Sequence, residues 1–187
     1  MTFMTAGPGF HTAEELLGLP RGTWRYELVA GALRRMSPSE YRHGTVVARV
    51  GSRLGPFVEQ HCLGETCGAE TGFLLRRNPD TVRAPDAAFI SNKTLAALAG
   101  PVEGFFPGAP DLAIEVRSPS DRDADLAGKI AGWLDAGSRA VLVIDPQRAR
   151  AALYRPGNRM TSFLRDDIVE LPDLLPGWSL ILGELFS

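Results

Sequence analysis

The sequence predicts an α+β fold with an α/β-like core, in which helices flank a mixed β-sheet. Strand-type runs and helical patterns are interspersed along the chain. Residues 140–144, AVLVI, form a continuous apolar run, which is typical of a strand buried on both faces. A helical pattern connects this run to the apolar stretch DLAIEV at residues 111–116. The order therefore indicates a mixed sheet in which a helix joins two core strands.

Periodicity and chain breakers place the elements along the chain. Helices are expected at residues 12–17, 42–60 and 93–98, and from about 120 to 137. Strands are expected at residues 24–29, 32–36, 65–77, 81–90, 111–116, 140–144, 151–154 and 160–164. Residues 92–110 form a long connection. The apolar, proline-rich residues 171–186 are expected to pack on the body of the protein.

Capping residues indicate where two of the helices begin and end. Thr12 with Glu15, and Ser120 with Asp123, have the spacing of a capping box, in which two side chains satisfy backbone N–H groups of the first turn. Gly137 is placed to terminate the second of these helices, because glycine tolerates the left-handed backbone found after a helix end.

The strands at residues 24–29 and 32–36 are expected to form an added N-terminal β-hairpin. They alternate in polarity and are separated by Ala30 and Gly31. A two-residue turn at this point is plausible because Gly31 is free to take a positive φ.

Bulk properties limit the class of protein. The 187 residues suit one domain, residues 1–187, with residues 1–11 as a loose tail. Cys62 and Cys67 are too few for a disulfide framework and are expected to be reduced. No apolar run suits a membrane helix and the N-terminus lacks signal-peptide features, so we expect a cytoplasmic protein without membrane contact. The net charge of −2 argues mildly against a broad basic face.

Two Pro-Asp pairs and one strand glutamate are the leading chemical candidates. They are Pro85-Asp86, Pro110-Asp111 and Glu115. Asp111 and Glu115 lie four residues apart on one strand, about 13 Å at ~3.3 Å per residue, which is too far to share one Mg²⁺ ion. Asp86 belongs to another strand and can lie beside Glu115. A glutamate among apolar residues needs a cation, a metal or a proton, and a structural ion pair is the alternative to a metal site.

Two basic residues compete to complete this site. Arg117 lies two residues after Glu115 and would share its face of the strand. Lys129 lies on the following helix, 40° from Trp133 at 100° per residue, so it reaches the edge of the apolar stripe. A lysine extended toward solvent is the alternative for Lys129. Two carboxylates with one cationic neighbour suit metal-dependent phosphodiester hydrolysis, because the ion activates water and the cation stabilises charge on phosphate.

The sequence resembles the Uma-type restriction endonuclease family, a branch of the PD-(D/E)XK nuclease superfamily. The central stretch that carries the resemblance is PDLAIEVRSPSDRDADLAGKIAGWLDAGSRAVLVIDP. The segments TAEELLGLP, RYELVAGALRRMSPSEYRHG, TVRAPDAAFIS and LPGWSLILGELF also match in order and spacing. The resemblance implies a restriction-endonuclease-like core, a four-stranded mixed sheet flanked by helices.

The resemblance also implies roles for individual residues. Asp86 and Glu115 would form the metal site, and Lys129 would be the family's lysine, moved from the strand to the next helix. Glu27 and His43 match further family positions, although an exposed strand glutamate and a helix-end histidine are the alternatives. Arg117 departs from the family, which usually has an apolar residue there, so it either assists the site or forms a structural ion pair.

These expectations describe a Mg²⁺-dependent endonuclease acting on DNA, with Mn²⁺ as a possible substitute. A homodimer is expected because cleavage of two strands commonly needs two active sites. Two alternatives stay open. One is a catalytically silent nucleic-acid-binding or regulatory protein on the same fold, which the acidic pI of about 5.9 favours. The other is a hydrolase of RNA or a small nucleotide. No Gly-x-Ser-x-Gly elbow, P-loop or dinucleotide fingerprint supports another chemistry.

Overall fold

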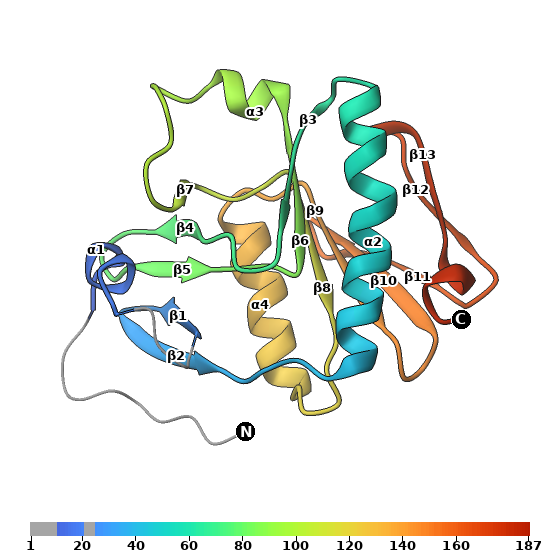
Figure 1. The fold of residues 1–187 in the computed structure, drawn as a ribbon, viewed down its shortest axis with the longest axis horizontal. Helices are drawn as coiled ribbons and strands as arrows, with labels where there is room; N and C mark the ends of the chain where they lie inside the picture. The colour runs from blue at the N-terminus through green and yellow to red at the C-terminus, as the bar shows by residue number, and fades with distance from the viewer. Residues whose placement is uncertain (1–10, 21–24) are drawn as a thin grey trace.

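The fold is a mixed α/β arrangement in which helices cover both faces of a six-stranded sheet (Figure 1). The computed structural model describes residues 11–20 and 25–187. In that part of the chain the helices are α1 (Ala13–Leu17), α2 (Tyr41–Gln60), α3 (Asn92–Ala96), α4 (Asp123–Asp135) and the 3-10 helix η1 (Leu182–Leu185). The strands are β1 (Arg25–Val29), β2 (Ala32–Met36), β3 (Gly64–Gly68), β4 (Phe73–Arg76), β5 (Thr81–Arg83), β6 (Ala87–Ser91), β7 (Phe106–Pro107), β8 (Leu112–Val116), β9 (Ala140–Asp145), β10 (Arg150–Arg155), β11 (Arg159–Phe163), β12 (Ile168–Leu171) and β13 (Leu175–Ile181).

The six-stranded sheet has the order β11-β10-β9-β8-β6-β3. Its centre is the pair β8 and β9, which run parallel and are connected by α4, so the predicted strand–helix–strand unit is confirmed. The neighbours on both sides pair antiparallel, which makes the sheet mixed as predicted. Every residue of β8 and β9 is buried, as expected for strands that are covered on both faces.

Alternate residues of β8 face the two sides of the sheet and pack against different helices. Leu112 and Ile114 belong to a cluster with Leu54 of α2, whereas Ala113 belongs to a cluster with Trp133 of α4. In Figure 1, α2 and α4 accordingly lie on opposite sides of the central strands. Glu115 has the same parity as Ala113 and therefore points toward α4.

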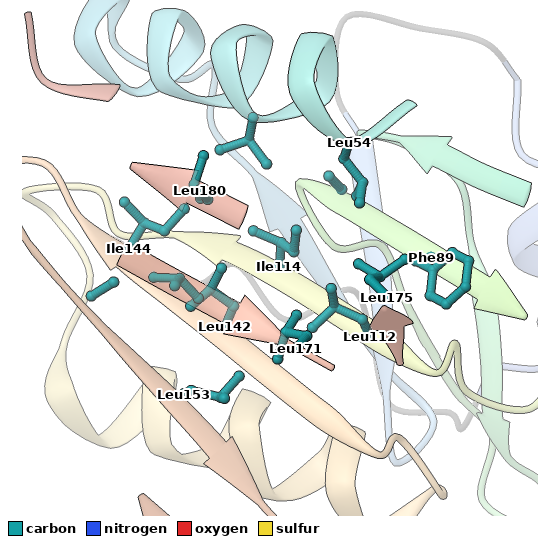
Figure 2. Close-up of a cluster of buried hydrophobic side chains, with 14 of the residues drawn as sticks. Leu54, Phe89, Leu112, Ile114, Leu142, Ile144, Leu153, Leu171, Leu175 and Leu180 are labelled. Carbon is teal, nitrogen blue, oxygen red and sulfur yellow. The ribbon is translucent and has the colours of Figure 1, made fainter. Parts of the chain in front are cut away.

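The C-terminal residues pack on the body as predicted, and they do so as a hairpin that the sequence pattern did not reveal. Strands β12 and β13 pair antiparallel. Figure 2 shows Leu171, Leu175 and Leu180 from this hairpin among the buried side chains of the central sheet and α2. The alternating burial of both strands shows that one face of the hairpin seals this core.

A second sheet, of order β2-β1-β5-β4-β7, contains the predicted N-terminal hairpin and lies on the α4 side (Figure 1). Strands β1 and β2 pair from Arg25↔Met36 to Val29↔Ala32. Ala30 and Gly31 both have positive φ, 49° and 78°, so the predicted tight turn is confirmed. The expected first strand residue, Trp24, and residues 1–10 of the expected tail lie outside the described residues.

Two strands that the sequence predicted as continuous are each divided between the sheets. Residues 65–77 form β3 in the larger sheet and β4 in the smaller, and residues 81–90 form β5 and β6 in the same way. The first break lies at a turn containing Glu70, whose φ is 80°. The second lies at Pro85, which has no N–H for a ladder hydrogen bond. The bend in the second strand positions Asp86.

Of the predicted helix ends, the start of α1 and the end of α4 are confirmed, and the start of α4 differs. Thr12 and Glu15 form the predicted capping box at α1, and Gly137, with φ of 110°, follows the end of α4. The predicted box of Ser120 with Asp123 is wrong, because α4 begins only at Asp123. The Asp121 carboxylate instead accepts a hydrogen bond from the Ser118 backbone N–H, at 2.9 Å.

The long connection at residues 92–110 contains two elements. Helix α3 confirms the predicted short helix, although it begins and ends earlier than expected. Strand β7 was not predicted and pairs parallel with β4. Across residues 11–20 and 25–187, no helix is long and apolar enough to cross a membrane.

Candidate active site

Glu115 lies near the end of the central strand β8 and is held by two donors from α4. Its side chain is 5% exposed. Lys129 Nζ donates to Oε2 at 3.2 Å, and Trp133 Nε1 donates to Oε1 at 2.8 Å. Lys129 and Trp133 are four residues apart on one helix face, which is why both reach the same carboxylate. The glutamate is therefore fixed in position, with a cation and a neutral donor on its two oxygens.

Several negative charges converge on this buried position. Burial raises the pKa of Glu115, and the charges of Asp86 and Glu27 add to that rise, while Lys129 opposes it. Burial alone would lower the pKa of Lys129, but the carboxylates of Glu115, Glu27 and Asp86 outweigh it and raise that pKa. Lys129 is thus favoured in its charged form by its contact with Glu115 and by the nearby charges of Glu27 and Asp86.

Asp86 lies at the bend before β6, beside the end of β8. The antiparallel register pairs Ala87, the first residue of β6, with Ile114. The Asp86 backbone N–H donates to the Ile114 carbonyl at 3.0 Å. The Val116 N–H donates to Asp86 Oδ2 at 2.7 Å. Both ends of the residue are therefore anchored to β8.

His43, in the first turn of α2, reaches Asp86 from the other face of the sheet. Its Nε2 lies 3.3 Å from Asp86 Oδ2. Burial would lower the pKa of His43, but hydrogen bonding and charge interaction with Asp86 outweigh burial and raise it. Its Nδ1 is buried and has no hydrogen-bond partner in the part of the chain that the structure describes. His43 is thus held beside the Asp86 carboxylate through its Nε2.

Glu27 of β1 is buried rather than exposed, and it forms an ion pair within the smaller sheet. Arg83 of β5 donates to Glu27 Oε2 at 3.1 Å, and the Ala84 N–H donates to Oε1 at 3.2 Å. Arg83 Nε is buried without a hydrogen-bond partner among the described residues. Glu27 therefore joins the electrostatic environment of Glu115 while its own oxygens are bound to Arg83 and Ala84.

Arg117 is directed away from this cluster. It pairs with the carboxylate of Asp123 and donates to the Asp121 carbonyl at 3.3 Å. Arg117 lies on the α4 side of the sheet, as the alternation predicted: its N–H donates to the Ile144 carbonyl at 2.7 Å, and its side chain lines a cavity with Leu126 and Val143 of the α4-side cluster. It shares the face of Glu115 but pairs with Asp123, so it forms the structural ion pair that was the alternative. Of the two competing basic residues, it is Lys129 that contacts Glu115.

Asp111, the aspartate of the second Pro-Asp pair, has a different environment. Its Oδ2 accepts hydrogen bonds from the Ser91 N–H at 2.8 Å and from Thr94 Oγ1 at 2.7 Å. These contacts hold the start of α3 against the sheet. Asp111 thus lies at the opposite end of β8 from Glu115, in agreement with the spacing argument.

The donor set of Asp86 and Glu115 fits a hard divalent cation. Carboxylate oxygens are preferred ligands of Mg²⁺, and the buried, net-negative cluster favours a cation. Among the described residues, no group of three or more His, Cys, Asp or Glu side chains is arranged to hold an ion by itself. The two carboxylates alone suit Mg²⁺, which commonly takes one or two carboxylates and completes its shell with water and substrate phosphate.

Two residues of this cluster were not singled out as functional from the sequence. Trp133 was assigned only to the apolar stripe of α4, yet its ring N–H binds Glu115. The available signal was its position four residues after Lys129, combined with the need of a buried indole N–H for an acceptor. Arg83 carried no signal, because its pairing with Glu27 depends on the division of the strand at residues 84–86.

Comparisons with known proteins agree with the fold. The model of the Uma2 family, described as "putative restriction endonuclease", matches residues 13–183. No curated protein matches the chain. Among solved structures, a "putative nuclease belonging to DUF820" from Anabaena variabilis ATCC 29413 superposes with a TM-score of 0.80. The superposition covers 94% of this chain and 97% of the other, at 22% sequence identity, so the likeness concerns the fold.

Proposed function

The chain belongs to the Uma2 family of "putative restriction endonucleases", and on this premise we propose that it is a metal-dependent endonuclease that hydrolyses phosphodiester bonds of DNA on a restriction-endonuclease-like core. The observation that supports this most is the buried Glu115, bound to Lys129 and Trp133, with the Asp86 carboxylate anchored to the N–H of the next residue, Val116. A buried carboxylate with an adjacent ammonium is costly for stability, and cation-assisted chemistry on an anionic substrate gives it a use.

Asp86 and Glu115 would hold Mg²⁺, with Mn²⁺ as a substitute. Such an ion, when bound, polarises the scissile phosphate and lowers the pKa of a coordinated water. Trp133 keeps the Glu115 carboxylate in one orientation, since its N–H occupies Oε1. The Val116 N–H does the same for Asp86. Both carboxylates are thus preorganised before substrate binds.

Lys129 supplies the positive charge that the reaction requires. Its ammonium is held at Glu115 and stays protonated, because the surrounding carboxylates raise its pKa. An ammonium at this position stabilises negative charge that develops on the attacked phosphate. His43 holds Asp86 from the α2 side through its Nε2. Glu27 adds negative electrostatic potential at Glu115 while its own carboxylate stays bound to Arg83.

The proposal is tested by incubating supercoiled plasmid with Mg²⁺ or Mn²⁺ and comparing the wild type with Asp86→Asn and Glu115→Gln. We expect metal-dependent nicking that either substitution slows by at least about a hundredfold, the scale of losing a directly acting charged group. Glu65→Gln, at an exposed position of the same sheet, is the matched control and should cleave normally. Melting curves with Mn²⁺ provide a second measurement, because the wild type should be stabilised by the ion and both site variants should not.

The competing function is a catalytically silent nucleic-acid-binding protein. Absence of cleavage with either metal, combined with retained DNA binding, would favour it. Cleavage that persists in both site variants would indicate a contaminating nuclease and would equally contradict the proposed site.

A further inference from the structure

A cavity of about 330 Å³ lies between the β1–β2 hairpin and α4. We call it the hairpin cavity and define it by Glu27, Arg34 and Met36 on the hairpin side and by Gly128 and Lys129 on α4. Glu27 and Arg34 are directly opposite each other in the hairpin register, so their side chains lie on one face, and Met36 follows on that face two residues later. The hairpin therefore presents one continuous wall to α4.

The hairpin cavity is continuous with the candidate active site. Glu27 and Lys129 line it, and the same two residues act electrostatically on Glu115. Lys129 Nζ is bound to Glu115. A ligand in the hairpin cavity would therefore contact residues that surround the reacting phosphate in the proposed function.

The lining of the hairpin cavity has a small excess of positive charge and so suits an anionic ligand that also has an apolar surface. Four cationic side chains, of Arg34, Arg35, Arg83 and Lys129, stand against three carboxylates, of Glu27, Asp121 and Asp125. Arg34 and Arg83 contribute guanidinium groups, which bind phosphate oxygens through two parallel hydrogen bonds. Val29 and Met36 contribute apolar surface next to these charges. A phosphate joined to a sugar and a base combines both properties.

The floor of the hairpin cavity is a glycine in the middle of a helix. Gly128 lies at the sixth position of α4, where glycine is unfavourable compared with other residues. A Cβ built at Gly128 would meet no atom within 4 Å, so neither packing nor backbone conformation requires glycine here. The missing side chain keeps the space above α4 open.

We propose that the hairpin cavity is a subsite for one unpaired nucleotide of the substrate strand, next to the phosphodiester that is cut. The inference rests on the proposed nuclease function and specifies its substrate class. The volume is near the lower end of the ~300–1,000 Å³ range of small-ligand sites. One nucleotide fits such a space, whereas a base pair with both of its backbones does not. The preferred substrate is therefore single-stranded, or carries an unpaired nucleotide beside the cleavage point.

The test is a binding measurement that does not depend on cleavage. Fluorescence anisotropy is recorded with a labelled single-stranded DNA oligonucleotide and with its blunt duplex, with Ca²⁺ in place of Mg²⁺. Gly128→Phe fills the hairpin cavity, and Gly51→Phe, at an exposed position of α2 where a Cβ meets no atom within 4 Å, is the matched control. We expect the single strand to bind more tightly than the duplex. Gly128→Phe should weaken its binding by about tenfold or more, the scale of losing one base contact, and Gly51→Phe should leave it unchanged.

A second pair of variants tests the same subsite without adding a large side chain to α4, which could affect folding. Arg34→Gln removes a guanidinium from the hairpin cavity, while Arg76→Gln removes one from the exposed end of β4 in the same sheet. Each substitution removes one positive charge, so the general loss of charge affects both variants equally. We expect Arg34→Gln to bind the single strand more weakly than Arg76→Gln, because only Arg34 would contact the nucleotide. Equal affinity of these two variants, normal affinity of folded Gly128→Phe, or equal wild-type affinity for single strand and duplex would each overturn the proposal.

The outcomes also separate this inference from the proposed function. A protein that never cleaves DNA, yet binds the single strand through Gly128 and Arg34, contradicts the nuclease and retains the subsite. A protein whose cleavage requires Asp86 and Glu115, but is unaffected by Gly128→Phe, retains the nuclease and contradicts the subsite.

Discussion

Lys129 Nζ lies 3.2 Å from Glu115 Oε2, so the cation next to the buried strand carboxylate comes from α4 and not from β8. The strand offers its own candidate, Arg117, two residues after Glu115. That side chain pairs with Asp123, whose side chain is 87% exposed. The two basic side chains are similarly covered, 22% exposed for Lys129 and 19% for Arg117, and they differ in partner, since Lys129 pairs with a buried carboxylate and Arg117 with an exposed one.

Replacing Lys129 with methionine should abolish plasmid cleavage and destabilise the fold, whereas Arg117→Met should do neither. Without Lys129, the buried Glu115 loses its cation, which typically costs about 3 kcal/mol or more of unfolding free energy. The Arg117 pair has one exposed partner, so its loss should cost less than about 1 kcal/mol. Urea denaturation and cleavage rates of both variants provide the comparison. A stable, active Lys129→Met protein would remove Lys129 from the mechanism.

Trp133→Phe should slow cleavage more than its effect on stability explains. The substitution keeps an aromatic ring but removes the N–H that binds Glu115 Oε1. A hydrogen bond to a charged group is worth about 1.5–3 kcal/mol, so we expect roughly a tenfold or larger loss of rate. Trp178→Phe is the matched control, because Trp178 is equally buried and donates only to the Arg53 carbonyl. Comparable activity of the two variants would show that Trp133 contributes packing alone.

The contact of Lys129 with Glu115 could be predicted from the sequence, because both residues lie in regular elements whose strand rise and helical angle are known. Strand rise excluded Asp111 as the partner of Glu115, and helical angles placed Lys129 on the edge of the face that carries Trp133. Both arguments use periodicities that hold as long as the element continues. Alternation also placed Arg117 on the α4 side, but it fixes only the face of the sheet, and the guanidinium pairs with Asp123 instead of Glu115.

The division of two predicted strands between two sheets could not be foreseen from alternation. An alternating pattern can continue through a bend, and only pairing with other strands decides which sheet each half joins. The environment of Glu27 depends on that division, because Arg83 and Ala84 lie at the break between β5 and β6. For the same reason its burial was left open at the level of sequence, with an exposed strand glutamate as the alternative.

The ion pair of Glu27 with Arg83 should show strong energetic coupling in a double-mutant cycle. Both side chains are largely buried, so either single alanine substitution leaves an uncompensated charge and should cost about 3 kcal/mol or more. The double variant should cost less than the sum, by roughly 1–3 kcal/mol. The control cycle is Arg25 with Glu70, a pair with the same 3.1 Å separation whose side chains are 58% and 61% exposed. Its coupling should stay below about 1 kcal/mol, and equal coupling in both cycles would contradict this account.

Asp80 should give the fold a stability component that is lost in acid. Its carboxylate accepts hydrogen bonds from the Ala13 N–H at 2.9 Å, the Asn78 N–H at 3.2 Å and Arg77 at 2.9 Å, and so joins α1 to the turn before β5. The Ala13 and Asn78 N–H groups, together with the Arg77 guanidinium, outweigh burial and lower the pKa of Asp80 below its ordinary value of 3.8. The carboxylate therefore stabilises the fold above pH 3.8, and this contribution is lost as pH falls through the lowered folded-state pKa.

Asp80→Asn tests this sign directly. Near pH 7 the variant should unfold about 1–3 kcal/mol more easily than the wild type, because its amide turns a donor toward an N–H that needs an acceptor. As the pH is lowered below 3.8, the difference should shrink, since the wild-type carboxyl then also becomes neutral. Asp166→Asn, at an exposed turn position, controls for the general loss of one negative charge. A difference between wild type and Asp80→Asn that grows in acid would mean that these hydrogen bonds do not favour the ionised form.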